Sequence, residues 1–414
     1  MSKRILFVVP AYPPYFVGGA QVHAKAIVDF LVKEKNARVV VLTTQACSPE
    51  DFWQRGKSRR DSLSEENVIR WPIGYLPFHR LILGISRLFV YAIARMHGPA
   101  TLTSVWGKLF PWVPGFAEYA ANLAKDCDVV HVMDISYDAI WCAGHRASLQ
   151  ARKPLIVLPL LHLGEPKSTI AIRHLLPHKI KAIFDAQAII VQTPTEKAFW
   201  HSLGVDESRL YIVGAGVNLG EVTGGVAKRF RVRWGLKADT PVVGFLGPFN
   251  KDKGVYDLIQ AARILWSKGV DFDLVIAGTL QRGDRALSGE TRFHLIGPLD
   301  EEEKKDFLAG IDILAMPSRV ESLGLVYLEA WANCKPVIGA YAGGVPDVIT
   351  DGVDGMLVPF GSPVALSEAL QLLLQDRERA TRLGRAGFEK VVKNFTWDKV
   401  LPRLGAVYED ILMR

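Results

Sequence analysis

The side chains with the most specific chemistry are Glu321 and Glu329, eight residues apart in the stretch PSRVESLGLVYLEA at 317–330. Gly324 predicts the start of a helix between them. Glu321 then lies in the preceding loop, and Glu329 lies two turns along the helix, facing the same crevice. A carboxylate among apolar helix residues is costly to bury unless it is paired. The pattern predicts two glutamates at a ligand site; the alternative is a glutamate at the core edge, bonded to a neighbouring backbone group.

Two lysines, Lys251 and Lys253, lie in the stretch GPFNKDKG at 247–254, between a short apolar run and a helical pattern. A lysine beside a helix N-terminus, at the end of a buried parallel strand, is well placed to hold a diphosphate. The alternative is a solvated turn with two surface lysines.

Glycine pairs follow two other apolar runs. Gly18 and Gly19 end the stretch PPYFVGG, and Gly343 and Gly344 precede the sequence VPD. Glycines at a strand-to-helix turn let the backbone approach a ligand, and the N–H groups there attract anions. The first pair does not form a Walker loop, because no Gly-Lys-Ser/Thr follows it. An ordinary strand-to-helix turn is the alternative.

Short runs of Val, Ile and Leu alternate with longer helical patterns along the chain. The runs are continuous, as expected of strands buried on both faces of a parallel sheet. This alternation predicts right-handed βαβ units in α/β, doubly wound parallel sheets. The predicted strands are 5–9, 39–43, 129–133, 155–158, 188–191, 210–213, 242–246, 272–277, 293–296, 311–316, 336–339 and 356–358.

A glycine-rich, apolar-poor stretch at 214–226 marks the predicted seam between two Rossmann-like domains, 1–220 and 221–395. The stretch also contains Gly214, Gly216 and Gly220 behind a predicted strand, so a nucleotide-dependent oxidoreductase is an alternative function. That fingerprint is weak, because residues 218–225 do not look like the start of the helix that it requires.

The composition excludes several classes of protein. With 414 residues, 49% of them hydrophobic and 22% charged, the chain is neither disordered nor fibrous. The four cysteines form no C-x-x-C pair, which argues against a disulfide scaffold or a zinc ribbon and favours a reducing compartment. The start of the chain does not resemble a secretory signal, and no stretch has the roughly 20 apolar residues of a membrane-spanning helix. We therefore expect a cytoplasmic protein.

Positive charge is concentrated in the first half, where residues 1–220 contain 25 Lys/Arg and 17 Asp/Glu. On a helix over Leu76–Arg95, Arg80, Arg87 and Arg95 fall within about 80° of one another, as a basic stripe on an otherwise apolar surface. This predicts peripheral contact with an anionic membrane surface, the inner face of the cell membrane. The alternative is that the helix packs its apolar face on its own domain. No motif indicates nucleic acid as a partner.

In this order the motifs resemble the retaining glycosyltransferases of family four, which have a GT-B fold and a Glu-x7-Glu motif. The segment from 311 through GGVPD at 343–347 to DGVDGMLV at 351–358 matches that family's donor-binding block almost throughout. The resemblance covers essentially the whole chain, is strongest from 240 to 400 and is absent in 50–125. It implies two domains facing across a cleft, the first binding the acceptor and the second the donor. A helix at about 396–414 would cross back to the first domain.

The resemblance also implies roles for single residues. Glu321 would hold sugar hydroxyls near the anomeric carbon, and Glu329 would hold the nucleotide ribose. His162, at the end of the stretch LPLLH, takes the position of the family's active-site histidine in the first domain, although a lone histidine is as often structural.

The donor diphosphate would be neutralised by Lys253, with help from backbone N–H groups at Gly324 and Leu325 and from the Gly18–Gly19 loop. Two departures stand out: Pro248 replaces an arginine of the family, and Gln21 replaces a glutamate. We expect Lys251, or else Arg319, to supply the missing positive charge.

The implied activity is that of a hexosyltransferase. It would move a sugar from a UDP- or GDP-sugar to a polysaccharide, glycolipid or lipid-linked acceptor, with retention of configuration. The nucleotide sugar is a co-substrate, and no cofactor is expected. No Asp-x-Asp motif is present, so we expect no metal requirement. A non-catalytic GT-B-like binding subunit is a further alternative, because of the departure at Pro248.

Overall fold

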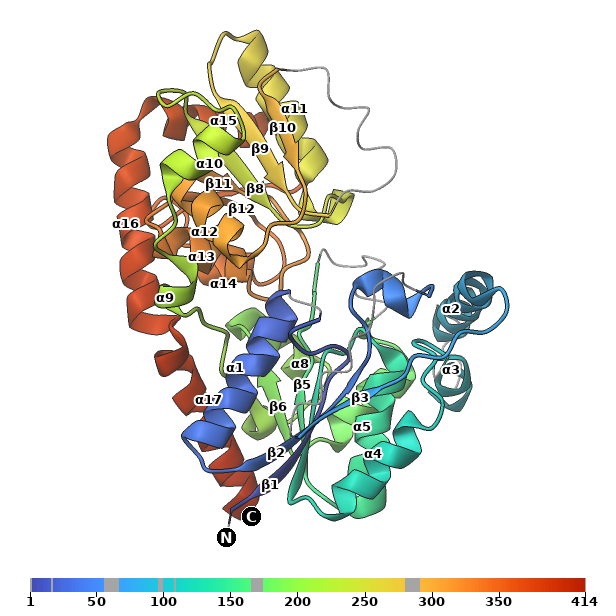
Figure 1. The fold of residues 1–414 in the computed structure, drawn as a ribbon. Coiled ribbons are helices and arrows are strands. Elements are labelled where there is room, and N and C mark those ends of the chain that lie inside the picture. The colour runs from blue at the N-terminus through green and yellow to red at the C-terminus, as the bar shows by residue number, and fades with distance from the viewer. Residues whose placement is uncertain are drawn as a thin grey trace. The chain divides into compact units, whose positions relative to one another are not determined.

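The computed structural model describes residues 2–15, 18–55, 67–95, 100–107, 109–164, 174–279 and 291–413 (Figure 1). These form two compact units. Unit 1 contains the described residues up to His162, those from His174 to Val213, and those from Leu401 on; unit 2 contains Gly214–Val400. The division therefore falls after Val213, whereas the sequence pattern placed it at 220.

The sheet of unit 1 has seven parallel strands in the order β3-β2-β1-β4-β5-β6-β7. Every residue of β4, β5 and β6 is buried, which explains their continuous apolar runs. The edge strand β3 was not expected, since its four residues are half-buried and include Arg70. The strands are β1 (Arg4–Val8), β2 (Arg38–Thr44), β3 (Val68–Trp71), β4 (Val129–Met133), β5 (Leu155–Leu158), β6 (Ala188–Val191) and β7 (Leu210–Ile212).

Helices α1 and α17 cover one face of this sheet, and α4 and α5 cover the other (Figure 1). Helix α7 contacts α5 and β5. The last part of α17 belongs to unit 1, where the Tyr408 hydroxyl lies 2.5 Å from Nδ1 of the buried His131. The helices are α1 (Gly19–Lys33), η1 (Pro49–Phe52), α2 (His79–Arg95), α3 (Ala100–Gly107), α4 (Phe116–Lys125), α5 (Asp138–Ala151), α7 (Pro177–Asp185), α8 (Pro194–Ser202), η2 (Glu207–Arg209) and α17 (Trp397–Met413).

The sheet of unit 2 has six parallel strands in the order β10-β9-β8-β11-β12-β13. The strands are β8 (Val242–Leu246), β9 (Asp273–Ala277), β10 (Phe293–Ile296), β11 (Ile313–Ala315), β12 (Val337–Ala340) and β13 (Met356–Val358). The helices are α9 (Leu219–Val222), α10 (Ala227–Arg233), η3 (Lys251–Lys253), α11 (Val255–Ser267), α12 (Glu301–Gly310), α13 (Leu325–Ala332), α14 (Val345–Val348), α15 (Pro363–Gln375) and α16 (Arg377–Asn394).

Both sheets are doubly wound, and in both the chain changes direction beside the first strand of the unit. In unit 2 this switch lies between β8 and β11, which pair through Val243 and Ile313. Ligands of open α/β sheets bind beyond the carboxyl ends of the strands at such a switch point. The topology therefore selects the loops after β8 and β11 as the place for a site in unit 2.

The structure modifies two expectations about local structure. A one-turn helix, α9, lies within the glycine-rich stretch, because the Asn218 side chain accepts a hydrogen bond from the Gly220 N–H and caps it. On α2 the predicted basic stripe is only partly exposed, with Arg80 at the surface. Arg87 is half-buried and lies over the ring of Phe110, 4.4 Å from the centroid, and the Arg95 side chain is outside the described part of the structure.

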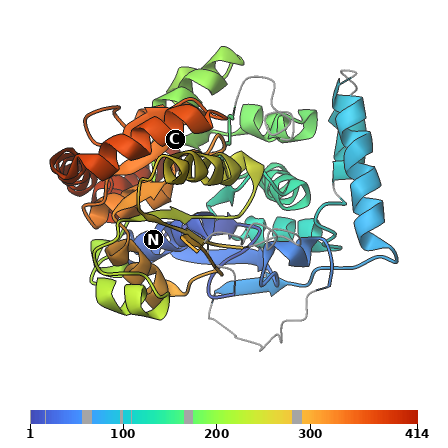
Figure 2. The ribbon, with the colours of Figure 1, turned by 90° about the horizontal axis from the view of Figure 1, so that it is seen from above.

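The alternative prediction, that α2 packs its apolar face on its own domain, holds for only part of its apolar residues. Leu83 and Val90 are buried, but Leu81, Ile85 and Leu88 are 63%, 43% and 69% exposed. Figures 1 and 2 show α2 at the outer edge of unit 1, beside α3.

Within the described ranges, no helix combines the length and apolar character needed to cross a bilayer.

Candidate functional site

Three loops meet at the carboxyl edge of the sheet in unit 2. They are residues 247–254 after β8, 316–324 after β11 and 341–344 after β12, and their strands are neighbours in the sheet. Each loop contains a stretch that the sequence singled out. The parallel order of the strands brings these stretches together although they are up to about ninety residues apart.

At the centre of the site, Lys253 and Glu321 form an ion pair. Lys253 Nζ donates to Glu321 Oε1 at 2.5 Å and lies 3.4 Å from the Val320 carbonyl oxygen. Their side chains are 18% and 10% exposed, so the pair is largely shielded from water but remains accessible at one side. A buried charge needs such a partner. A ligand anion that binds Lys253 would therefore compete with Glu321.

The loops after β8 and β11 are locked together by the main chain. Asn250 caps η3 through a hydrogen bond from the Lys253 N–H, and Gly254 follows with a φ of +74°. A Cβ atom on Gly254 would lie 2.2 Å from the Pro317 carbonyl oxygen. Glycine is required there by both the conformation and the contact, and this close approach fixes where the Lys253 side chain starts.

Helix α13 begins at Leu325, four residues after Glu321, with Gly324 as its N-cap at a φ of +92°, as expected. Helix N-termini leave N–H groups free to receive an anion. Tyr327 anchors this turn by donating its hydroxyl to the Met316 carbonyl oxygen at 2.6 Å, and burial raises the pKa of Tyr327 well above its usual range. Lys253, Glu321 and this helix end therefore converge on one region.

The Gly343–Gly344 turn closes the third side of the site. The Gly344 N–H donates to the Glu321 carbonyl oxygen at 3.3 Å, and a Cβ atom on Gly343 would lie 2.9 Å from that same oxygen. This turn thus supports the backbone of Glu321. The sequence indicated a glycine turn near a ligand, and the structure shows it in contact with the loop that carries the glutamate.

The two candidates for the missing arginine have different surroundings. Arg319 donates to Asp252 Oδ1 from Nε and Nη2, at 3.0 and 2.7 Å, and lies over the Phe360 ring. Lys251 is exposed on η3. Its charge acts on Asp257, where it partly offsets the rise in pKa that burial causes. The charge of Arg319 is thus matched by Asp252, a residue that the sequence analysis did not single out.

Glu329 also has a cationic partner, Lys304 on α12, whose Nζ donates to Glu329 Oε1 at 2.7 Å. The Glu329 side chain is 15% exposed. Lys304 lies in the run DEEEKK (300–305), which is indistinguishable from a solvated helix face in the sequence. No sequence signal identified it, because the pairing depends on the tertiary structure that brings Lys304 of α12 to Glu329 of α13.

In unit 1, His162 lies in a small polar cluster at the carboxyl ends of β4 and β5. Its backbone N–H donates to Nδ1 of His174 at 3.4 Å, and the two rings are 5.6 Å apart. His174 Nε2 lies 3.4 Å from the Ser136 hydroxyl, and Asp134 accepts from the Ser136 N–H. Burial raises the pKa of Asp134. His174, Ser136 and Asp134 were not expected from the sequence.

The remaining predicted residues have simple local roles. Gly18 is the N-cap of α1, and Gly19 is its first residue. Gly216, part of the alternative dinucleotide fingerprint, is packed against its own chain: a Cβ atom there would lie 3.0 Å from the Phe395 carbonyl oxygen. This glycine therefore serves the contact between Val217 and Thr396 rather than the approach of a pyrophosphate. Among the described residues, no group of three His, Cys, Asp or Glu side chains could hold a metal ion.

Residues 226–390 match the family model described as Glycosyl transferases group 1, and they include all three loops of the site. The chain is 31% identical over 244 residues to the D-inositol 3-phosphate glycosyltransferase of Corynebacterium glutamicum (strain R), covering 55% of this chain and 58% of that protein. The protein of the same description from Catenulispora acidiphila is 29% identical over 329 residues, 71% of this chain and 76% of its own. The match thus spans a little over half the length of the first relative.

Solved structures resemble the whole chain. Anabaena HepE in complex with UDP has a TM-score of 0.71 at 16% identity, covering 99% of this chain and 100% of its own. Sucrose-phosphate synthase from Thermosynechococcus elongatus has a TM-score of 0.71 at 21% identity, covering 100% of both chains. At these identities the likeness concerns the fold alone. The prediction of a GT-B fold with two Rossmann-like parallel-sheet domains is confirmed.

Proposed function

We propose that this protein is a retaining glycosyltransferase that moves a hexose from a UDP- or GDP-sugar to a polysaccharide, glycolipid or lipid-linked acceptor. The observation that carries the proposal is the Lys253–Glu321 pair beside the N-terminus of α13, at the switch point of a sheet within the segment matching the Glycosyl transferases group 1 model. A cation, a helix end and an accessible carboxylate suit a diphosphate joined to a sugar.

In the proposed donor complex, the diphosphate takes the place of Glu321 at Lys253 and also accepts from the free N–H groups at Leu325. The carboxylate of Glu321 is then released to accept from sugar hydroxyls. Glu329 would accept from the ribose hydroxyls while Lys304 keeps its carboxylate charged and oriented. Gly18 and Gly19, at the start of α1, remain predicted contributors to phosphate binding. The complex of HepE with UDP-glucose supports a nucleotide sugar as the donor class.

Transfer with retention fits a substitution on one face of the sugar. The acceptor oxygen forms a bond to the anomeric carbon as the bond to the diphosphate breaks, and a diphosphate oxygen takes the acceptor proton. The charge that develops on the leaving oxygens is stabilised by Lys253 and the helix end, which are already in place. His162 is proposed to contact the transferred sugar, with His174 fixing its backbone. This chemistry needs no metal, so activity is proposed to be metal-independent.

The direct test is a panel of UDP-, GDP-, TDP- and ADP-sugars, measured first as a shift of melting temperature and then as release of nucleoside diphosphate. A true donor binds the folded state and raises the melting temperature. Lys253→Ala should abolish the shift. Lys390→Ala, which breaks a similar ion pair with Asp354 in the same unit, should leave it intact. If no nucleotide sugar stabilises the wild-type chain, the proposal fails.

The two alternative functions are tested by the same protein sample. A nucleotide-dependent oxidoreductase would bind NAD(P)H in a fluorescence titration, and Gly216 argues against it because its close contact is with Phe395. A non-catalytic binding subunit would bind a nucleotide sugar without turnover. Release of nucleoside diphosphate by the purified chain alone would exclude that alternative.

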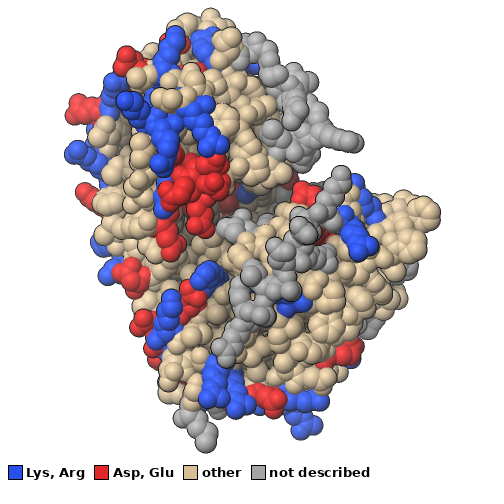
Figure 3. Space-filling view, viewed as in Figure 1, with Lys and Arg blue, Asp and Glu red and all other residues tan. Residues whose placement is uncertain are grey.

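A second part of the proposal is peripheral attachment to an anionic membrane through α2 and α3. The specific observation is an exposed apolar surface formed by Phe78, Leu81, Ile85, Leu88 and Phe89 with Leu102 and Val105, each between 43% and 82% exposed. On α2 these residues lie within an arc of about 100°. Residues 67–117 contain five Lys/Arg and no Asp/Glu. Figure 3 shows this lobe of unit 1 as mostly uncharged surface with basic side chains beside it.

The membrane contact is thus proposed to be apolar, with the arginines at its border, rather than the basic stripe that the sequence suggested. An amphipathic helix binds such a surface by burying apolar side chains between headgroups. Leu81→Ser with Leu88→Ser should reduce co-sedimentation with phosphatidylglycerol-containing vesicles at least tenfold. Val232→Ser, an equally exposed apolar site in unit 2, is the control. Unchanged co-sedimentation of the double variant would refute the apolar contact.

A further inference from the structure

A cavity of about 580 Å³ opens on the helical face of unit 1, between α3, α4, α5 and α7. Its walls are mostly apolar and come from four separate segments of the chain. They include Val105, Trp112, Val113, Pro114, Phe116 and Leu149. An apolar cavity of this size with a few polar groups is typical of a small-molecule site.

The charged side chains around the cavity are already paired with one another. Arg146 donates to Glu118 at 2.8 Å, and Lys181 donates to Asp185 at 2.7 Å. These cations lie toward solvent, with the Arg146 and Lys181 side chains 43% and 59% exposed, so they offer no charge to the apolar interior of the cavity. The cavity is therefore suited to a neutral molecule.

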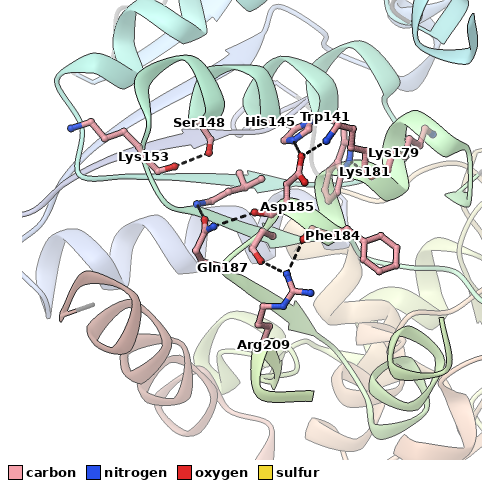
Figure 4. Close-up of polar contacts among 12 residues, drawn as sticks. Trp141, His145, Ser148, Lys153, Lys179, Lys181, Phe184, Asp185, Gln187 and Arg209 are labelled. Atoms are coloured by element: carbon pink, nitrogen blue, oxygen red, sulfur yellow. Dashed lines mark hydrogen bonds and ion pairs between the residues drawn. The ribbon is translucent and has the colours of Figure 1, made fainter. Parts of the chain in front are cut away.

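One polar group in the wall, the imidazole of His145, is oriented by a hydrogen bond and can accept another. His145, on α5 and 8% exposed, has its Nε2 2.8 Å from Asp185 Oδ2, and Figure 4 shows the two side chains pointing toward each other. A carboxylate accepts only from an N–H, so Nε2 carries the hydrogen. Burial lowers the pKa of His145, although Asp185 opposes this, and the ring is then neutral with Nδ1 as an acceptor. Among the described residues, the His145 side chain has one hydrogen bond, the one from Nε2 to Asp185.

A second imidazole in the wall repeats this arrangement. His178 Nε2 lies 2.7 Å from Asp138 Oδ1, and its buried Nδ1 has no hydrogen-bond partner among the described residues. Asp138 is in turn paired with the buried Lys179. His145 thus supplies an acceptor nitrogen to the wall of an otherwise apolar cavity, and His178 adds a buried ring nitrogen that is unpaired among the described residues. A ligand that complements this wall therefore carries a hydrogen-bond donor.

We propose that this cavity is a second ligand site, which binds a neutral, largely apolar molecule carrying one hydroxyl group, with the hydroxyl donating to His145 Nδ1. The apolar walls take up the body of the ligand, and the imidazole selects for a hydroxyl over an ether or a hydrocarbon. The proposal does not depend on the glycosyl transfer proposed above, because the cavity lies wholly within unit 1 and its test uses no nucleotide sugar.

The test compares two probes of nearly equal shape, 2-naphthol and 2-methoxynaphthalene, by isothermal titration of the full chain near pH 7.5. We expect one molecule of 2-naphthol to bind, about tenfold more tightly than the methyl ether, which is the worth of one hydrogen bond to a neutral acceptor. Equal affinities, or no binding of either probe, would overturn the proposal without involving any variant.

Two pairs of variants locate the site. His145→Phe keeps an aromatic ring in the wall, and Asp185 still has Lys181 as an ion-pair partner. The variant should bind 2-naphthol only as tightly as it binds the methyl ether. His201→Phe, on the surface of α8, is the control. Ala143→Leu fills the cavity and should weaken both probes at least tenfold, whereas Gln150→Leu, on the exposed side of the same helix, should not. Binding that survives both His145→Phe and Ala143→Leu would place the ligand elsewhere and refute the assignment.

Discussion

Replacing Glu321 by glutamine removes the charge that faces Lys253 and keeps the size of the side chain. The two atoms that form the pair are 2.5 Å apart, and the side chains are only 18% and 10% exposed. At an effective dielectric constant of 20, their attraction is about 7 kcal/mol before the cost of desolvation is subtracted. Removing one partner of a buried pair typically costs about 3–5 kcal/mol. Because the amide oxygen still accepts from Lys253, we expect the lower end, about 3 kcal/mol.

A loss of 3 kcal/mol lowers the melting temperature of a unit of this size by about 6–12 °C. The informative measurement is the effect of UDP on that temperature. In wild type the diphosphate must compete with Glu321 for Lys253, whereas in Glu321→Gln the lysine has no anionic partner. The variant should therefore be less stable than wild type without ligand, yet gain more from UDP. Differential scanning calorimetry with and without UDP at low salt measures both effects.

The matched control is Asp354→Asn, which weakens the ion pair with Lys390. That pair has a distance of 2.6 Å and exposed fractions of 21% and 5%, close to those of the pair at the site. This variant should lose comparable stability and show the wild-type response to UDP. If Glu321→Gln and Asp354→Asn respond alike to UDP, the diphosphate does not bind at Lys253, and the reasoning about the donor site is refuted.

Four other outcomes are expected. Lys251→Ala should lower kcat/KM by about 10²-fold or more, the cost of losing one preorganised donor, and an unchanged value would transfer the role to Arg319. Gly254→Ala should cost about 3 kcal/mol in urea unfolding, because a Cβ atom meets the Pro317 carbonyl oxygen at a φ of +74°; Gly235→Ala, also at positive φ but with open space around it, should cost about 1 kcal/mol. Burial lowers the pKa of His23 and of His131 to about 3, so the unfolded chain binds protons that the folded chain does not. The free energy of unfolding should fall from about pH 6.5 toward pH 3 by about 1.4 kcal/mol per pH unit for each histidine. His131→Phe should remove the contribution of one histidine from this pH dependence. Sugar transfer should continue in EDTA, and its loss would contradict metal independence.

The regular part of the fold was predictable because burial on both faces of a sheet leaves a direct mark on the sequence. The apolar runs at 129–133, 155–158 and 188–191 coincide with β4, β5 and β6. The edge strand β3 was missed, since an edge strand whose residues are all only half-buried needs no continuous apolar run. Asn218 shows the same limit: its side chain caps α9 in a stretch whose glycines suggested a loop.

Residue types and their order along the chain also identified the lysine, the glutamate and the Gly343–Gly344 turn that meet in unit 2. Parallel strands bring the loops at their carboxyl ends to one edge, so the positions of Lys253, Glu321 and Gly343 followed from the strand pattern. That these residues meet at one edge of the sheet was therefore predictable without coordinates, and their roles in donor binding remain predictions.

Tertiary structure alone decided which charges are paired and which surfaces face water. Glu321 neutralises Lys253, Asp252 binds Arg319, and Lys304 binds Glu329, although each pair joins segments whose spacing carries no signal. The same holds for α2, where Arg87 packs on Phe110 while Leu81 and Leu88 remain exposed. A helical pattern shows that two faces differ, but the neighbouring segments determine which face is buried, because burial is a property of the packed chain rather than of the helix.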